Sequence, residues 1–240
     1  MHLDPIVVSI ATHNARREHL PKTIESIKQS VVPVEINIWH NEPSDYELID
    51  GTINHLADAN HGARSKFLEQ HLTPYSHYYF TCDDDLIYHP QYFETLALKL
   101  KQKNHRCVAG VHGSYYLKHP VDDYFWNQKV VHFSAEIKND QFVTMLGTGT
   151  MAFHSSLFDD VDLFSYIGDD FNNMVDVKVA ELCINREIPR LCIQRPKNFV
   201  KEQDNSQESA IWHKAAKSAE RQTAVLNAID KKKFMYRPKC

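Results

Sequence analysis

The sequence predicts a single α/β domain built on a mostly parallel central sheet that is flanked by helices. The first observation is an apolar segment at 5–12, followed by apolar residues at helical spacing and a second apolar segment at 34–40. This order is that of a βαβ unit, whose crossover is right-handed in nearly all proteins. The second observation is that three expected strands end in polar residues, at 12–16, 41–44 and 83–85. Because the carboxyl ends of neighbouring parallel strands meet at one crevice, we expect these three loops to build one pocket.

The composition is that of an ordinary globular protein. The chain has 240 residues, of which 42% are hydrophobic and 24% are charged, which is enough for one large α/β domain. A net charge of -4 argues against nucleic acid as the main partner, because such proteins carry a basic footprint. The five cysteines form no CxxC pair, which predicts neither a disulfide framework nor a thiolate zinc site. With no leader peptide and no bilayer-spanning apolar run in view, we expect a cytoplasmic protein.

The first half of the chain is expected to alternate strands and helices. Pro33 closes the first helix, and Pro90 suits the start of the third. Gly62 permits close backbone approach where the second helix opens, and Arg64 and Lys66 there could receive a phosphate. In order, the expected elements are a strand at 5–12, a helix at 20–31, a strand at 34–40, a helix at 60–68, a strand at 78–82, a helix at 90–100 and a strand at 107–111.

The second half is less regular. Aromatic residues crowd the segment 113–133 without a clear period, and they could either stack on a sugar or fill a core. A strand expected at 142–146 runs into Gly147 and Gly149, a pattern that marks a bulge or a ligand close to the backbone. The remaining expectations are a strand at 151–153, a helix at 174–186, a strand at 190–194, a long helix from a capping box at Asp204 and Gln207 to residue 229, and a solvated basic tail at 231–240.

The residues around which the chain is organised are Asp83, Asp84 and Asp85, directly after the aromatic run at 78–82. Three adjacent carboxylates repel one another and are costly to desolvate, so a divalent cation or basic groups must lie among them. Carboxylate oxygens suit Mg²⁺ or Mn²⁺, and these ions in turn suit a substrate diphosphate. The alternative interpretation is an acidic surface turn, and the two companion polar strand ends argue against it.

These segments carry a resemblance to a known family. The run Ile-Val-Val-Ser-Ile-Ala-Thr-His-Asn at 6–14, the Asn60-x-Gly62 stretch and Asp83-Asp84-Asp85 resemble family 2 glycosyltransferases of the Rossmann-like GT-A fold. The likeness spans the first half well and the second half in outline. It implies a metal-dependent inverting enzyme that uses Mn²⁺ or Mg²⁺ and moves a sugar from a nucleotide-diphosphate sugar to a glycan or lipid-linked acceptor. By the same resemblance, such an enzyme builds bacterial surface polysaccharide and contacts the inner face of the membrane.

The resemblance also implies two halves, residues 1–112 for the nucleotide sugar and 113–230 for the acceptor, and a role for single residues. Asp85 would bind the metal, with His213, or else His154, as a further metal contact. The catalytic base would be Asp176, with Asp170 as second choice, although Asp176 could simply complement the positive end of a helix. The implied donor-binding residues are Thr12, Asn14, Arg16, Asn41, Arg64, Asp83 and Asp84.

Other function classes fit part of the pattern. An aspartyl-phosphate phosphotransferase would place its aspartates after the first strand, whereas here they follow the third. A nucleotidyltransferase that makes sugar nucleotides would carry a glycine-rich loop after the first strand, and residues 12–15 contain no glycine. A sugar-nucleotide-binding module without catalysis and a metal-dependent phosphotransferase both remain as alternatives.

Overall fold

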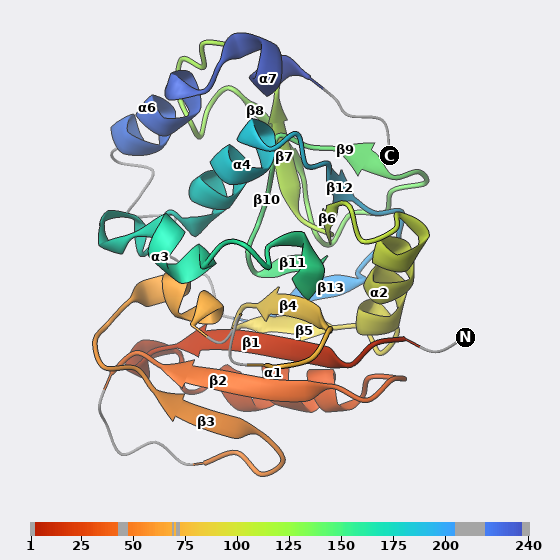
Figure 1. Ribbon diagram of the computed structural model, residues 1–240. Coiled ribbons are helices and arrows are strands. Elements are labelled where there is room, and N and C mark those ends of the chain that lie inside the picture. The colour runs from red at the N-terminus through yellow and green to blue at the C-terminus, as the bar shows by residue number, and fades with distance from the viewer. Residues whose placement is uncertain (1–2, 43–47, 69, 71–72, 205–218, 237–240) are drawn as a thin grey trace.

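The computed structural model of the chain describes residues 3–42, 48–68, 70, 73–204 and 219–236. Its centre is one eight-stranded sheet, which Figure 1 shows as strands stacked through the molecule. The strands β3, β2, β1 and β4 are parallel, β11 is antiparallel to both β4 and β6, and β12 is parallel to β6. This confirms the predicted α/β class with a mostly parallel sheet. In spatial order the strands are β3 (Ile53–Leu56), β2 (Glu35–His40), β1 (Ile6–Thr12), β4 (Tyr78–Cys82), β11 (Thr150–His154), β6 (Val108–Gly110), β12 (Arg190–Cys192) and β9 (Gln141–Phe142).

The strand order creates a switch point at the carboxyl ends of β1 and β4. From β1 the chain continues through a helix to β2 on one side, whereas β4 joins β1 on its other side. Ile10 of β1 is the register partner of Cys82 of β4, so Asp84 is level with Thr12. Ligand sites of open α/β sheets form where the connections diverge in this way. The fold therefore places the acidic residues at the edge where a site is expected.

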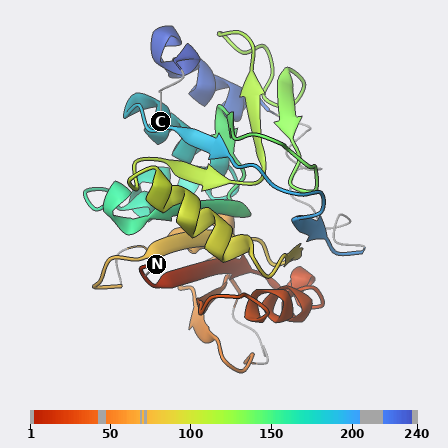
Figure 2. The ribbon, with the colours of Figure 1, turned by 90° about the vertical axis from the view of Figure 1, so that its right-hand side faces the viewer.

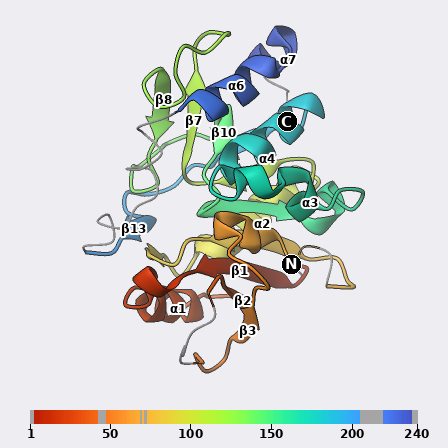
Figure 3. The same cartoon turned by 90° about the vertical axis from the view of Figure 1, so that its left-hand side faces the viewer.

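Helices cover both faces of this sheet, which explains why β1 and β4 are mostly apolar and are buried along nearly their whole length. On one face, α1 (Leu20–Lys28) and α2 (Tyr92–Gln102) pack with Val8 and Phe80. On the other, α3 (Leu163–Ile167) and α4 (Val175–Asn185) pack with Val7 and Tyr79. Figures 2 and 3 view the molecule from opposite sides, and in both α1 and the α3–α4 pair lie on opposite sides of the sheet.

Two smaller sheets belong mainly to the second half. One contains β10 (Met145–Leu146), β7 (Gly113–Tyr116) and β8 (Gln128–Val131), and the other pairs β13 (Val200–Glu202) with β5 (Leu86–Tyr88). The single strand predicted at 142–146 is therefore wrong, because β9 belongs to the main sheet and β10 to a small one. Tyr116 of β7 is buried against α4 and α7, so part of the aromatic segment is core.

The helix predicted at 60–68 is instead a six-residue 3-10 helix, η2 (Gly62–Phe67). The expected α-helix is therefore wrong, and so is the helix N-terminus on which a phosphate was expected; phosphate binding by Arg64 and Lys66 themselves stays a prediction. Three more short 3-10 segments are η1 (Asn14–Arg16), η3 (Ser155–Leu157) and η4 (Asp169–Phe171).

The C-terminal region closes over the second half with α6 (Glu220–Ala228) and α7 (Lys231–Met235). Most of the long helix predicted from Asp204 falls at 205–218, outside the described residues. The start of the predicted basic tail is α7, whose first N–H groups are capped by Asp230 and whose Phe234 is buried. Within the described ranges, no helix combines the length and apolarity needed to cross a bilayer. The four cysteines in these ranges are buried, and no disulfide joins them.

Candidate functional site at the carboxyl ends of β1 and β4

The candidate site begins where the ends of β1 and β4 lie side by side. The Thr12 hydroxyl donates to Oδ2 of Asp84 at 2.7 Å, as their level positions in the register require. The Thr23 hydroxyl of α1 lies 2.9 Å from the backbone carbonyl of Asp84, and the backbone N–H of Gln203 donates to the carbonyl of Asp85 at 3.2 Å. The end of β1, the helix α1 and the segment after β13 therefore all form hydrogen bonds with the turn 83–85.

Arg16, which follows β1 in η1, lies against the same turn. Its guanidinium pairs with Asp84 at 3.5 Å and forms a closer ion pair with Asp85. All three side chains are at least nine-tenths buried. The structure thus brings together Thr12, Arg16, Asp84 and Asp85 as predicted, but Arg16 contacts carboxylates where a pocket-lining role was expected. Asp85, the predicted metal ligand, accepts from Arg16 here.

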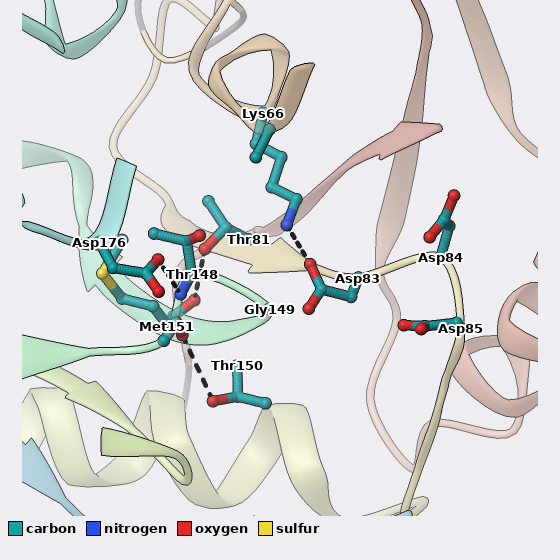
Figure 4. Close-up of polar contacts among 12 residues, drawn as sticks. Lys66, Thr81, Asp83, Asp84, Asp85, Thr148, Gly149, Thr150, Met151 and Asp176 are labelled. Atoms are coloured by element: carbon teal, nitrogen blue, oxygen red, sulfur yellow. Dashed lines mark hydrogen bonds and ion pairs between the residues drawn. The ribbon is translucent and has the colours of Figure 1, made fainter. Parts of the chain in front are cut away.

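Asp83 points to a different partner. Its carboxylate pairs with the ammonium of Lys66 in η2, as Figure 4 shows. With 42% of its side chain exposed, Asp83 is the most accessible of the three aspartates. Arg64 points elsewhere, because its guanidinium pairs with Asp169 and lies 3.9 Å from the ring centre of Phe164. Lys66, and not Arg64, is therefore the basic residue of η2 that lies in the site.

The glycine-containing turn before β11 approaches Asp83 on its other side. A Cβ atom on Gly149 would lie only 1.9 Å from Oδ2 of Asp83, so no side chain fits at this position without displacing that carboxylate. The buried Tyr88 hydroxyl ties the two segments together, because it donates to the carbonyl of Gly149 at 2.6 Å and accepts from the N–H of Asp83 at 2.9 Å. The sequence predicted a bulge or a ligand close to the backbone at these glycines. In the structure the group that lies close to Gly149 is the Asp83 carboxylate of the same chain.

Asp176 completes the cluster from the first turn of α4. Its Oδ1 accepts from the backbone N–H of Thr148 at 2.9 Å, which holds the carboxylate beside the turn that contacts Asp83 (Figure 4). Asp170 lies in η4 with 83% of its side chain exposed and pairs with Arg221 at 3.4 Å. Of the two predicted bases, Asp176 is the one whose charge interacts with Asp83 and Lys66.

The electrostatics of the cluster follow from burial and from an excess of negative charge. Burial raises the pKa of Asp84 to about 6, even though Arg16 works in the opposite direction. Burial and the neighbouring charge of Asp83 raise the pKa of Asp85 to about 7. Although 42% of the Asp83 side chain is exposed, the protein around its carboxylate also opposes the charged form. The ammonium of Lys66 outweighs this effect and lowers the pKa of Asp83. Burial raises the pKa of Asp176 as well.

The chemistry of these side chains suits a divalent cation, although no three of the described carboxylates bring their oxygens within 4.8 Å of one another. Within the described residues, four carboxylates (Asp83, Asp84, Asp85 and Asp176) interact with two cationic side chains, Arg16 and Lys66. Burial is the main cause of the raised pKa values of Asp84 and Asp85, and the neighbouring charge of Asp83 adds to it. Mg²⁺ and Mn²⁺ take carboxylate oxygens of this kind, and Asp83 is exposed enough to reach such an ion.

Several predicted residues have other surroundings. The Asn41 side chain is buried. It forms hydrogen bonds with the backbone of His61 and Gly62 and with Ser65, so its polar groups support the loop before η2. The backbone N–H of Asn14 donates to Glu42 at 3.1 Å, and its surface is exposed beside the site. His213 lies outside the described residues.

His154, the alternative metal contact, is far from the acidic turn. It ends the antiparallel β11, where it is the register partner of Tyr78, the first residue of β4. The whole length of β4 therefore separates His154 from Asp83, and its predicted role beside the acidic residues is wrong. The direction of β11, which the sequence pattern did not reveal, causes this difference.

Sequence reasoning missed some residues of the site. Tyr88 was not predicted, because a lone tyrosine gives no signal of a bridging hydroxyl. His112 was also missed. Its ring lies where a Cβ on Gly147 would come within 2.8 Å, and burial, with the charge of His132, lowers its pKa to about 4. His112 therefore stays neutral beside the site.

A surface hollow of about 690 Å³ lies elsewhere, beside α2, where Lys99, Lys138 and Arg195 are among its lining residues. None of the predicted site residues lines it, so it adds nothing to the candidate site. Comparison of the chain with protein-family models finds no match, and comparison with curated protein sequences finds none either. The function must therefore be inferred from the residues themselves.

Proposed function

We propose that this protein is a metal-dependent glycosyltransferase with a GT-A fold. It would transfer a sugar, with inversion, from a nucleotide-diphosphate sugar to a glycan or lipid-linked acceptor, in bacterial surface polysaccharide synthesis at the inner face of the membrane. The observation that carries the proposal is the acidic cluster itself, which combines an accessible Asp83 with Arg16 and Lys66 at the switch point of the sheet. Such a cluster suits a cation and a diphosphate together.

The residues of the cluster would divide the work between them. A bound divalent cation supplies positive charge where the departing nucleotide diphosphate becomes more negative. Lys66 and Arg16 would bind diphosphate oxygens; in this structure the same cationic groups pair with Asp83 and Asp85. Gly149 lets the Asp83 carboxylate lie against the turn, because any side chain at this position would displace it.

Asp176 would take the proton from the acceptor hydroxyl. Burial raises its pKa, which makes the carboxylate a better proton acceptor than an exposed aspartate. The N–H of Thr148 fixes one carboxylate oxygen and so orients the group. The tie to the Thr148–Gly149 turn also keeps the base at a set position relative to Asp83.

The test is thermal unfolding in the presence of a panel of nucleotide-diphosphate sugars, each with and without Mn²⁺. A donor at about 100 times its dissociation constant stabilises the folded state by about 2.7 kcal/mol, which a melting curve resolves. We expect at least one donor to raise the melting temperature only with Mn²⁺, and the same donor to release its nucleotide diphosphate when an acceptor is added.

Two variants locate the effect. Asp83→Asn should abolish the Mn²⁺-dependent shift, whereas Asp160→Asn, which changes an exposed carboxylate paired with Arg186, should preserve it. A panel without any Mn²⁺-dependent shift would overturn the proposal. A shift without turnover for any acceptor would instead support the sugar-nucleotide-binding module.

A further inference from the structure

A second group of ligand-type side chains lies at the opposite edge of the sheet. Asp4 precedes β1, His105 follows α2, and His154 ends β11. One carboxylate oxygen and one ring nitrogen from each histidine all lie within 4.8 Å of one another. Three segments that are far apart in the sequence thus place their ligand atoms together. On the right of Figure 1 this region lies near the N-terminal end of β1.

Hydrogen bonds from neighbouring groups fix the rings of the two histidines. Nε2 of His154 lies 3.1 Å from Oδ2 of Asp4, while its Nδ1 lies 2.7 Å from the hydroxyl oxygen of Ser156. The backbone N–H of Ser156 also donates to this Nδ1 at 3.3 Å, so the proton of the neutral ring lies on Nε2 and faces Asp4, and a metal bound at Nε2 would displace that proton. His105 has a similar partner, because the Tyr78 hydroxyl lies 3.1 Å from its Nε2.

The two histidines of the cluster are held close together, and one of them lies in an unusual backbone conformation. The two imidazole rings stack with centroids 3.9 Å apart and planes inclined by 11°, so they cannot both be positively charged without strong repulsion. His105 has a backbone φ of 60° and follows Asn104 with a φ of 51°, both in the left-handed region that residues other than glycine seldom adopt. A tight turn thus presents an imidazole to the cluster at a conformational cost.

We propose that Asp4, His105 and His154 form a second cation site that binds Zn²⁺, separate from the acidic cluster. Two imidazole nitrogens and one carboxylate oxygen are a common three-residue zinc set, and water fills the fourth position. Asp4 is 42% exposed, which gives the ion access from solvent. The rings are nearly parallel, so the His105 ring must turn for both lone pairs to meet one ion.

Bound Zn²⁺ would join the chain before β1, the turn after α2 and the end of β11. These three segments lie at the edge of the central strands that is opposite to the candidate active site. The ion would therefore stabilise the folded state without touching that site. The proposal does not depend on the glycosyltransferase function.

The experiment is calorimetric titration of the metal-free full chain with Zn²⁺, together with the ¹⁵N chemical shifts of the histidine rings. We expect one tight equivalent of Zn²⁺, with shifts at His105 and His154. Asp4→Asn and His105→Asn should each weaken the affinity by at least about 10-fold. Asparagine tolerates the left-handed backbone at position 105, so the turn should survive this change.

Two control variants separate this site from other zinc binding. His89→Asn removes an exposed histidine elsewhere, and Asp83→Asn disables the acidic cluster, so both should keep the tight equivalent. Unchanged zinc affinity in both Asp4→Asn and His105→Asn would overturn the proposal and leave an ordinary His154–Asp4 ion pair. Loss of the tight equivalent in Asp83→Asn would overturn it as well.

Discussion

The two ends of β4 carry opposite kinds of polar cluster. At its carboxyl end, Asp83 to Asp85 meet Arg16 and Lys66, and the donors are carboxylate oxygens. At its amino end, Tyr78 contacts the cluster of His105, His154 and Asp4, where imidazoles outnumber carboxylates. Oxygen donors favour Mg²⁺ or Mn²⁺, while imidazoles favour Zn²⁺. One strand thus separates two candidate cation sites with different preferences, of which only the first lies at the switch point where α/β folds bind substrates.

The largest expected effect tests whether the carboxyl end alone carries turnover. Asp176→Asn keeps an oxygen for the N–H of Thr148 but removes the proton acceptor. The turnover number should fall about 10²- to 10⁴-fold, the usual contribution of a general base. The Mn²⁺-dependent thermal shift with the donor should persist, since the carboxylates at 83–85 are intact. Steady-state kinetics and melting curves measure the two effects.

Asp170→Asn is the matched control for this variant, because Asp170 is exposed and pairs with Arg221. It should retain full turnover. Loss of turnover in Asp170→Asn with normal rates in Asp176→Asn would exchange the two assignments.

A second change attacks the acidic cluster through the backbone. In Gly149→Ala the new Cβ would lie 1.9 Å from Oδ2 of Asp83, so the carboxylate must move. The affinity for donor and Mn²⁺ should fall at least about 10-fold, as for lost support of a metal ligand. Zinc binding at the amino end of β4 should be unchanged, which makes it an internal control measured on the same sample. Equal affinity for the donor in both proteins would show that Asp83 does not need its present position.

The two ends should also respond to pH in opposite directions. Burial raises the pKa of Asp84 to about 6 and that of Asp85 to about 7, so their protonated forms stabilise the fold. That contribution is complete below pH 3.8 and is lost as the pH rises through about 6 to 7. Burial, with the charge of His154, lowers the pKa of His105, so its contribution is present above pH 6.5 and is lost as the pH falls.

Urea unfolding of the metal-free protein between pH 4 and pH 8 measures both contributions. In Asp85→Asn the loss of stability on raising the pH should be smaller than in the wild type, and in His105→Asn the loss on lowering the pH should be smaller. Mn²⁺ should oppose the first loss, because it favours the ionised carboxylates. A stability profile that neither variant alters would contradict the electrostatic account of both ends.

The smallest expected effect concerns the support of the acidic turn. Tyr88→Phe removes a hydroxyl that bonds both Gly149 and Asp83, and leaves these two buried partners unsatisfied. The free energy of unfolding should fall by about 1–3 kcal/mol. Tyr92→Phe is a close control, since the buried Tyr92 hydroxyl has no hydrogen-bond partner among the residues that the structure describes, and the stability of this variant should be unchanged or higher. Denaturant unfolding compares the two, and equal losses would show that the Tyr88 hydroxyl has no special role.

Much of the carboxyl-end site could be predicted because it depends on local pattern and strand direction. The apolar runs ending at Thr12 and Cys82 indicated covered parallel strands, and parallel neighbours bring their carboxyl ends together. Thr12, Arg16 and the three aspartates consequently meet as expected. Which of Arg64 and Lys66 reaches the acidic turn was not predictable. Side chains two residues apart point in different directions in any helix, so the outcome depends on which face of η2 packs toward Asp83, and local pattern does not give that.

The sequence by itself determined the α/β class, the parallel strands of the first half and the presence of a carboxylate cluster at a strand end. These features follow from hydrophobic period and from the chemistry of adjacent charges, which act over a few residues. Only the tertiary structure decided that β11 runs antiparallel, that Asp176 lies beside Asp83, and that Asp4, His105 and His154 form one group. Contacts between distant segments depend on how the whole sheet packs, and no local pattern encodes that packing.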